Sequence, residues 1–394
     1  MSADDVWRAP DPDAEPVRRP DPAPYQGPAP HPAPAPHQGG WPPPGLAWGY
    51  RPPPPRPGVI PLTPLGIGEV ISGVFRTLRQ YAKALLVPLS LAALVVLALC
   101  GVYLAVGYSA VGGIIDDARS QVDYQLTDGQ ATTVGITAVV GVLLLLCCFW
   151  GFSLVATTVS TAVLRHAAVG RPVTAGRLWS ESRPYLGRVI RTQLLLGLAA
   201  LGGLLVAVLP GALIGLATGS AAVFGVLTAC LLLPVAAFGG YAAVRLALVT
   251  PVLILENQPP VAAVRRAWRL NEGSWWRSLG IPYVVRMIGS FAAQVVTVPA
   301  MIIGVVVMVS TSAPTERIDE YGEAVTSSVP TAFGVFFLIG CVLVGYGLAM
   351  ALAAPLQPLT DGLLYLDRRI RRENLAAVLA AEAQRAASAE RDPS

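Results

Sequence analysis

Charged residues are scarce in this chain of 394 residues. They make up 13% of the sequence, about half the ~25% typical of soluble domains, while hydrophobic residues reach 54%. Lysine is nearly absent, because Lys83 is the one lysine and the other 27 basic residues are arginine. This composition excludes an ordinary soluble enzyme. A net charge of only +4 also argues against nucleic-acid binding as the main task.

Side chains that usually carry catalysis or bind metals are also few. Of the three histidines, His31 and His37 lie in the proline-rich segment 1–58, and His166 lies alone where the second long apolar run ends. The five cysteines all lie in apolar runs and none forms a CxxC pair: Cys100, Cys147, Cys148, Cys230 and Cys341. No GxSxG, HExxH or phosphate-binding loop is present. We therefore predict that the chain is not an enzyme and has no catalytic, cofactor-binding or metal-binding residues.

Residues 1–58 differ from the rest of the chain in composition. They hold nineteen of the 36 prolines, and their apolar residues are sparse and without period. Such a segment buries too little apolar surface to offset its chain entropy, so we predict a disordered, proline-rich cytoplasmic tail. The run from Pro52 to Pro57 favours extended polyproline II. A spacer is the favoured role, and a docking arm for a protein partner is the alternative.

Long runs without charge follow the tail. They cover 84–106, 134–164, 192–244, 287–310 and 331–360. Because about 20 apolar residues cross a bilayer, and a Thr218-Gly219-Ser220 turn signal divides the third run, six spans are expected. Their approximate limits are 84–106, 135–160, 194–217, 221–244, 287–310 and 331–354. We predict an all-α integral membrane protein, with a six-span domain over 59–360 and a cytoplasmic C-terminal helix and tail over 361–394.

Basic residues gather on one side of these spans. The loops at 107–133 and 311–330 each carry one arginine and four acidic residues. The segments at 59–83, 165–191, 245–286 and 361–394 together carry 21 basic residues. Because cytoplasmic loops are enriched in Lys and Arg, we predict a multi-pass protein of the cell membrane. Both acidic loops then lie outside the cell, and both termini are cytoplasmic.

Each predicted hairpin of spans follows a proline and a short amphipathic stretch with aromatic residues. These stretches begin at Pro64, Pro172 and Pro260. The first has an apolar stripe at helical spacing, formed by Leu65, Val70, Val74, Leu78 and Tyr81. Arginine and aromatic side chains in such positions are typical of helices that lie in the membrane interface. We predict three hairpins, each preceded by a cytoplasmic interfacial helix. The apolar segment Leu246–Leu255 is too short to span and is predicted to be interfacial or re-entrant.

Three sets of cytoplasmic residues are candidate sites. A candidate collar for anionic lipid headgroups comprises Arg177, Trp179, Arg183, Arg188, Arg265, Arg266, Trp268, Arg269, Trp276 and Arg277. A candidate buried ion-pair set comprises Arg245, Glu256, Arg286 and Asp361, for which snorkelling to the interface is the alternative. In a predicted C-terminal helix over 360–385, Asp367 is expected to dock on Arg265 or Arg269, and Arg369 is expected to pair with Glu373.

Polar and small residues within the spans carry two further expectations. Gln294 lies deep in the fifth span and is expected to bond a neighbouring helix. The pairs Gly202-Gly203 and Gly239-Gly240 are expected to mark close helix packing. The centres of all six spans lack Asp and Glu, which argues against a proton or cation relay.

Four segments resemble a known membrane domain. They are RHAAVGRPVTAGRLW (Arg165 to Trp179), RLALVTPVLILE (Arg245 to Glu256), AAVRRAWRLNEGSWWRSLGI (Ala262 to Ile281) and LLYLDRRIRRE (Leu363 to Glu373). Over roughly residues 60–375 the chain is similar to the membrane domain of bacterial glycerophosphoryl diester phosphodiesterases and to stand-alone actinobacterial integral membrane proteins. The resemblance implies the membrane architecture. We expect the catalytic barrel of the two-domain members to be absent, because no aqueous segment here is long enough to hold it.

Two functions remain open. The first is a non-catalytic membrane scaffold or lipid-interacting protein, which the basic and aromatic collar favours. The alternative is a transporter or permease for a lipid or small solute, because transporters often contain internal repeats. A membrane-embedded enzyme ranks third, since no acid, base and nucleophile converge. The expected partners are the bilayer and its anionic headgroups on the cytoplasmic face, and no nucleic acid.

Overall fold

The computed structural model describes residues 65–120, 124–318 and 324–373, and the predicted tail over 1–58 lies outside them. The helices are α1 (Ile67–Gln80), α2 (Ala82–Ser120), α3 (Asp128–Val169), α4 (Ala175–Thr218), α5 (Ala221–Leu246), α6 (Val249–Leu255), α7 (Pro260–Leu270), α8 (Trp275–Ser310), α9 (Ala332–Ala353) and α10 (Leu356–Glu373). Two strands, β1 (Ala313–Ile318) and β2 (Ala324–Val329), pair antiparallel between α8 and α9. The strands lie in the acidic loop at 311–330, for which the sequence predicts no helix or strand.

Six helical segments in the described part of the chain are long and apolar enough to cross a membrane. The all-α class and the six spanning helices are thus confirmed, and the protein is a polytopic membrane protein. The prediction of a separate interfacial helix in the stretch that begins at Pro172 is wrong, because this stretch forms no helix of its own. It continues into the third span as α4, whose 44 residues extend about 66 Å, against about 30 Å for the hydrocarbon core.

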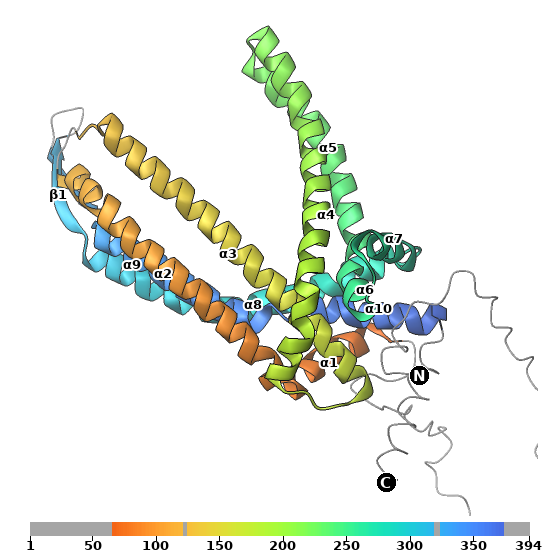
Figure 1. Cartoon of the computed structure of the whole chain (residues 1–394). Helices are drawn as coiled ribbons and strands as arrows, with labels where there is room; N and C mark the ends of the chain where they lie inside the picture. The colour runs from red at the N-terminus through yellow and green to blue at the C-terminus, as the bar shows by residue number, and fades with distance from the viewer. Residues whose placement is uncertain (1–64, 121–123, 319–323, 374–394) are drawn as a thin grey trace, which may run out of the picture.

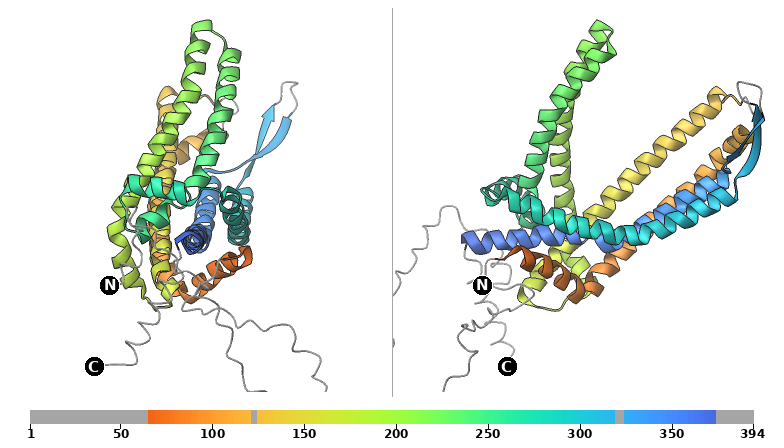
Figure 2. Two further views of the ribbon diagram at one scale, coloured as in Figure 1. Left: turned by 90° about the vertical axis from the view of Figure 1, so that its right-hand side faces the viewer. Right: turned by 180° about the vertical axis from the view of Figure 1, so that it is seen from behind.

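Three helical hairpins share a common base. The hairpins α2–α3, α4–α5 and α8–α9 converge on α1, α6, α7 and α10, and from there α2–α3 and α8–α9 run in the same direction (Figures 1 and 2). Toward their far ends these two hairpins remain in contact, because the Ala332 N–H donates to Asp116 Oδ1 at 3.0 Å. We call the four short helices α1, α6, α7 and α10 the platform. The α4–α5 hairpin leans away from the other two, and no residue of α5 is buried. Its apolar surface therefore faces the bilayer.

The platform forms the main core of the protein. The predicted stripe of α1 is buried: Leu65, Val70, Val74 and Tyr81 are each at most 4% exposed. It packs on α10, where Leu363 approaches Gly73. The segment α6 is also enclosed by protein, since Leu253 and Ile254 are fully buried. These helices therefore bury their apolar faces against each other, and protein encloses α6. The interfacial or re-entrant position of Leu246–Leu255 stays a prediction.

Glycines bring α8 and α9 into close contact. A Cβ atom on Gly304 would lie 2.7 Å from Leu338 Cδ1 and 3.0 Å from Leu338 Cα. A Cβ atom on Gly345 would lie 2.8 Å from Ala300 Cβ. Of the pairs predicted for this role, only Gly203 faces another helix, because a Cβ atom built on it would lie 3.4 Å from Val235 Cγ1 on α5. Nothing lies within 4 Å of a Cβ built on Gly202, Gly239 or Gly240. Small residues allow backbones to approach, but the facing helix decides which ones are used.

Candidate functional site

A buried carboxylate ties the first described residues to the C-terminal helix. Asp367 on α10 is fully buried, accepts a hydrogen bond from the Leu65 N–H at 2.9 Å and pairs with Arg371 at 2.8 Å. Arg277 at the start of α8 lies 3.5 Å from the second oxygen of Asp367 and donates to the Leu65 carbonyl. The prediction that α10 docks on protein through Asp367 is thus confirmed. The prediction that Arg265 or Arg269 is its partner is wrong. Both of these arginines are exposed.

A second buried network joins α6, α7 and α10. The Glu256 carboxylate, whose side chain is 0% exposed, pairs with Arg266 and accepts the Tyr365 hydroxyl at 2.8 Å. Arg266 also pairs with Glu373 at 2.8 Å, and Glu373 pairs with Arg369 at 2.7 Å, as the sequence predicted. Burial alone would lower the Arg266 pKa, but the charges and hydrogen bonds of the two carboxylates raise it. Arg266 therefore stays charged and joins the three helices.

The predicted buried ion-pair set does not assemble. Of its four members, Glu256 is in the network above, but its partner is Arg266. Arg245 stacks over the Tyr241 and Trp268 rings and donates to the Tyr241 hydroxyl. Asp361 accepts from the Gln357 amide at 3.3 Å, and Arg286 is exposed. The four residues were grouped because each lies a similar number of residues from the predicted membrane edge. They belong to four different helices, however, and each side chain has different neighbours.

The predicted headgroup collar divides into two groups. Six of its residues are exposed: Arg177, Trp179, Arg183, Arg265, Arg269 and Trp276. The other four hold the protein together. Arg266 and Arg277 pair with buried carboxylates, Arg188 bonds Asn257, and Trp268 lies under Arg245. The exposed six can meet lipid headgroups, and Arg177 among them also pairs with Glu181.

His166 also has a local partner. Its Nε2 lies 2.7 Å from the Glu181 carboxylate, which pairs in turn with Arg177 at 2.9 Å. This contact joins the end of α3 to the start of α4. In the described part of the chain, no three His, Cys, Asp or Glu side chains are placed to share a metal ion.

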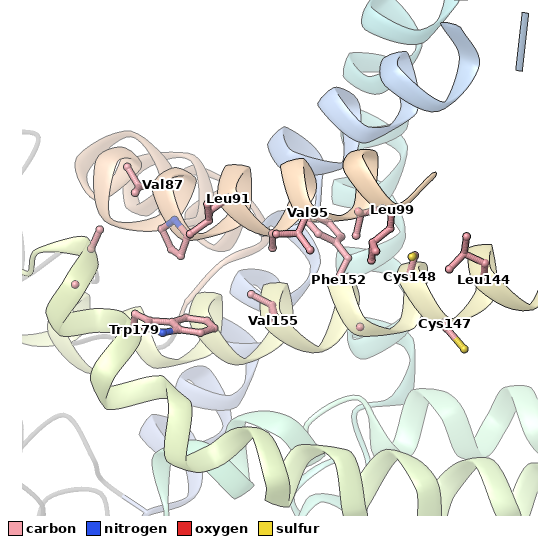
Figure 3. Close-up of a pocket in the computed structure, with 16 residues that line it drawn as sticks. Val87, Leu91, Val95, Leu99, Leu144, Cys147, Cys148, Phe152, Val155 and Trp179 are labelled. Atoms are coloured by element: carbon pink, nitrogen blue, oxygen red, sulfur yellow. The ribbon is translucent and has the colours of Figure 1, made fainter. Parts of the chain in front are cut away.

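Two apolar hollows border α3 within the membrane. The larger has a volume of about 670 Å³ and lies between α2 and α3, closed at one end by the start of α4. Figure 3 shows Trp179 at one end of this hollow, near Val87 and Leu91, and Leu144 at the opposite end. The smaller hollow, about 430 Å³, lies between α2, α3 and α9. Trp179 therefore borders an apolar hollow as well as the surface, which its sequence position did not reveal.

A third hollow is amphipathic and lies between α3, α8 and the α9–α10 junction. Its volume is about 550 Å³. Its polar lining comes from hydroxyl, amide and guanidinium groups: Ser153, Thr157, Arg286, Ser290, Gln294, Thr297 and Gln357. We call it the crevice. Phe152 lines all three hollows, so it separates the crevice from the two apolar hollows.

Comparison with known proteins gives no relative for this chain. No family model, no curated protein and no solved structure matches it. The arrangement of platform, hairpins and hollows is therefore the basis for any statement about function.

Proposed function

We propose that the chain is a non-catalytic, lipid-interacting protein of the cell membrane whose platform lies on the cytoplasmic side and meets anionic headgroups. The observation that supports this is the exposure of Arg177, Arg183, Arg265 and Arg269 close to the platform. Basic side chains near an anionic membrane surface contribute about 1 kcal/mol each to attraction. Trp276, 78% exposed, adds an aromatic group suited to the headgroup layer.

The buried charges favour a structural role over a catalytic one. Glu256 and Glu373 each pair with Arg266 of α7, and Asp367 pairs with Arg277 of α8 and Arg371 of α10. Carboxylates used in this way hold helices together and have no open side at which a substrate proton is transferred. We also propose, from the four similar segments, that the chain is a member of the phosphodiesterase membrane-domain family.

Orientation is tested by cysteine labelling. In a background with the five native cysteines replaced by alanine, the Gln125→Cys variant should react with a membrane-impermeant maleimide on intact cells. The Thr174→Cys variant should react only after permeabilisation. Both positions are exposed, and they lie just beyond opposite ends of α3. Labelling of the Thr174→Cys variant on intact cells would show that the proposed orientation is inverted.

The lipid interaction is tested with the triple variant Arg183→Gln, Arg265→Gln, Arg269→Gln. The reconstituted wild type should select spin-labelled phosphatidylglycerol over phosphatidylcholine, and the triple variant should lose most of this preference, a several-fold change. The preference should also fall as salt is raised from 0.01 to about 0.15 M, because the Debye length shortens from about 30 to about 8 Å. Equal selectivity in the two proteins would contradict the proposed function.

One observation favours a second function. The crevice contains an arginine and two glutamines at or near membrane depth, which is where a transporter binds its substrate. The alternative is therefore a transporter or permease for a lipid or small solute. Solute or lipid flux in proteoliposomes, compared between wild type and an Arg286→Gln variant, separates it from the non-transporting lipid-interacting protein.

A further inference from the structure

Arg286 differs from the arginines buried in the platform because it has no acidic partner in residues 65–120, 124–318 and 324–373. It lies on α8, next to the platform, and its side chain lines the crevice. A guanidinium in this position keeps all of its donors available to a ligand. Because it is exposed and unpaired, an anionic group can approach it without breaking an existing contact.

Two glutamines in the same crevice have amide groups without a partner. Gln294 was expected to bond a neighbouring helix, but it makes no hydrogen bond within the described part of the chain. The Gln357 amide nitrogen donates to Asp361 at 3.3 Å, whereas its Oε1 atom is buried and accepts no hydrogen bond from the described residues. An amide oxygen or nitrogen without a partner is costly in an apolar environment. Together with Arg286, these amide groups indicate that a polar ligand completes the crevice.

Polarity falls along α8 away from the platform. Arg286, Ser290, Gln294 and Thr297 lie on one face of this helix, and Gln294 lies about 12 Å beyond Arg286 at 1.5 Å per residue. The order is therefore a cation, a hydroxyl, an amide and a second hydroxyl. A glycerophospholipid has the matching order of a phosphate, polar ester groups and then acyl chains.

Apolar space adjoins the deep end of the crevice. Phe149, Phe152, Tyr346 and Met350 line both the crevice and the apolar hollow of about 430 Å³ beside it. These side chains, two from α3 and two from α9, lie between the two volumes. An acyl chain that follows Phe149 and Tyr346 thus stays in contact with apolar side chains.

We propose that the crevice binds one anionic glycerophospholipid. Its phosphate lies at Arg286, its ester groups lie beside Gln294 and Gln357, and its acyl chains lie along Phe149 and Tyr346. An anionic headgroup is favoured because it carries no cation of its own to compete with the guanidinium. This inference rests on the proposed lipid interaction and adds a single site that is separate from the exposed collar.

The test counts retained lipid by native mass spectrometry of the full chain in mild detergent. Wild type with added phosphatidylglycerol should retain one molecule, and phosphatidylcholine should be retained at least tenfold less well. Arg286→Gln should lower phosphatidylglycerol retention at least tenfold. Ala293→Trp, which fills the crevice and leaves every charge in place, should do the same. The matched control is Arg76→Gln, which removes an exposed arginine of α1 outside the crevice and should retain lipid as wild type does.

The outcomes separate this site from the collar. If Arg286→Gln and Ala293→Trp retain phosphatidylglycerol as wild type does, the crevice proposal is overturned, whatever the collar triple variant shows. Equal retention of the two lipids by wild type also overturns it. If the crevice variants lose the lipid but the collar triple variant keeps its bilayer selectivity, the crevice stands and the collar role fails. Each variant is first shown to keep the wild-type unfolding midpoint, so lost retention is not lost folding.

Discussion

The Glu256→Ala variant is expected to lose about 3 kcal/mol of unfolding free energy in detergent, at the lower end of the 3–5 kcal/mol typical of a broken buried ion pair. The side chain of Glu256 is 0% exposed, and that of its partner Arg266 is 16% exposed. The substitution leaves a buried guanidinium with Glu373 as its remaining carboxylate and removes the acceptor of the Tyr365 hydroxyl. Denaturant titration followed by tryptophan fluorescence measures the loss.

The matched control for this experiment is Glu272→Ala. Glu272 is exposed at the end of α7, so the same truncation should change stability by less than about 0.5 kcal/mol. A double-mutant cycle with Arg266→Leu should show favourable coupling between Glu256 and Arg266, because the two side chains are in direct contact. A loss at Glu256 no larger than at Glu272 would mean that the network does not hold α6, α7 and α10 together.

The Gly304→Ala variant is expected to lose about 1–3 kcal/mol by overpacking between α8 and α9. The added Cβ atom would lie 3.0 Å from Leu338 Cα, which is backbone and cannot rotate away. The helices must therefore move apart and lose contacts on both sides of Gly304. The same denaturant titration measures the effect, and disulfide trapping between α8 and α9 reports the separation.

Gly239→Ala provides the matched control for the packing effect. Nothing lies within 4 Å of a Cβ atom built there, so no contact opposes the substitution. Alanine is the better helix former by about 1 kcal/mol, so stability should stay the same or rise. A similar loss at both glycines would mean that backbone conformation, rather than close packing of α8 on α9, explains the Gly304 result.

Charge partners illustrate what a linear sequence leaves undetermined. Asp367 was predicted to meet Arg265 or Arg269, yet it meets Arg277, which lies 3.5 Å away on a different helix. All three arginines belong to one basic stretch, and composition does not rank them. The choice of partner depends on the turn between α7 and α8, because this turn places Arg277 beside both Leu65 and Asp367. By contrast, the Arg369–Glu373 pair is four residues apart on one helix, so helical geometry alone predicted it.

The hollows around α3 could not be predicted for the same reason. In the sequence, Phe152 is one of many apolar residues in its span, and no local pattern predicts that its side chain lines three hollows. Its role arises because α3 packs loosely against α2 and α9. Likewise, Gln294 was recognised as a polar residue at depth, but whether it faced protein or an open crevice depended on the rotation of α8.

The sequence by itself determined the membrane class, the six spanning segments, the amphipathic stripe of α1 and the Arg369–Glu373 pair of α10. Each follows from a local requirement: backbone polar groups must be paired within a helix in lipid, apolar stripes must be covered, and side chains four residues apart on a helix are neighbours. The tertiary structure alone decided what covers that stripe, which arginines are buried, which glycines allow close contact and where space remains. These features depend on how separate helices pack against each other. Because the chain has many similar arginines, glycines and leucines, its composition is equally consistent with several packing arrangements.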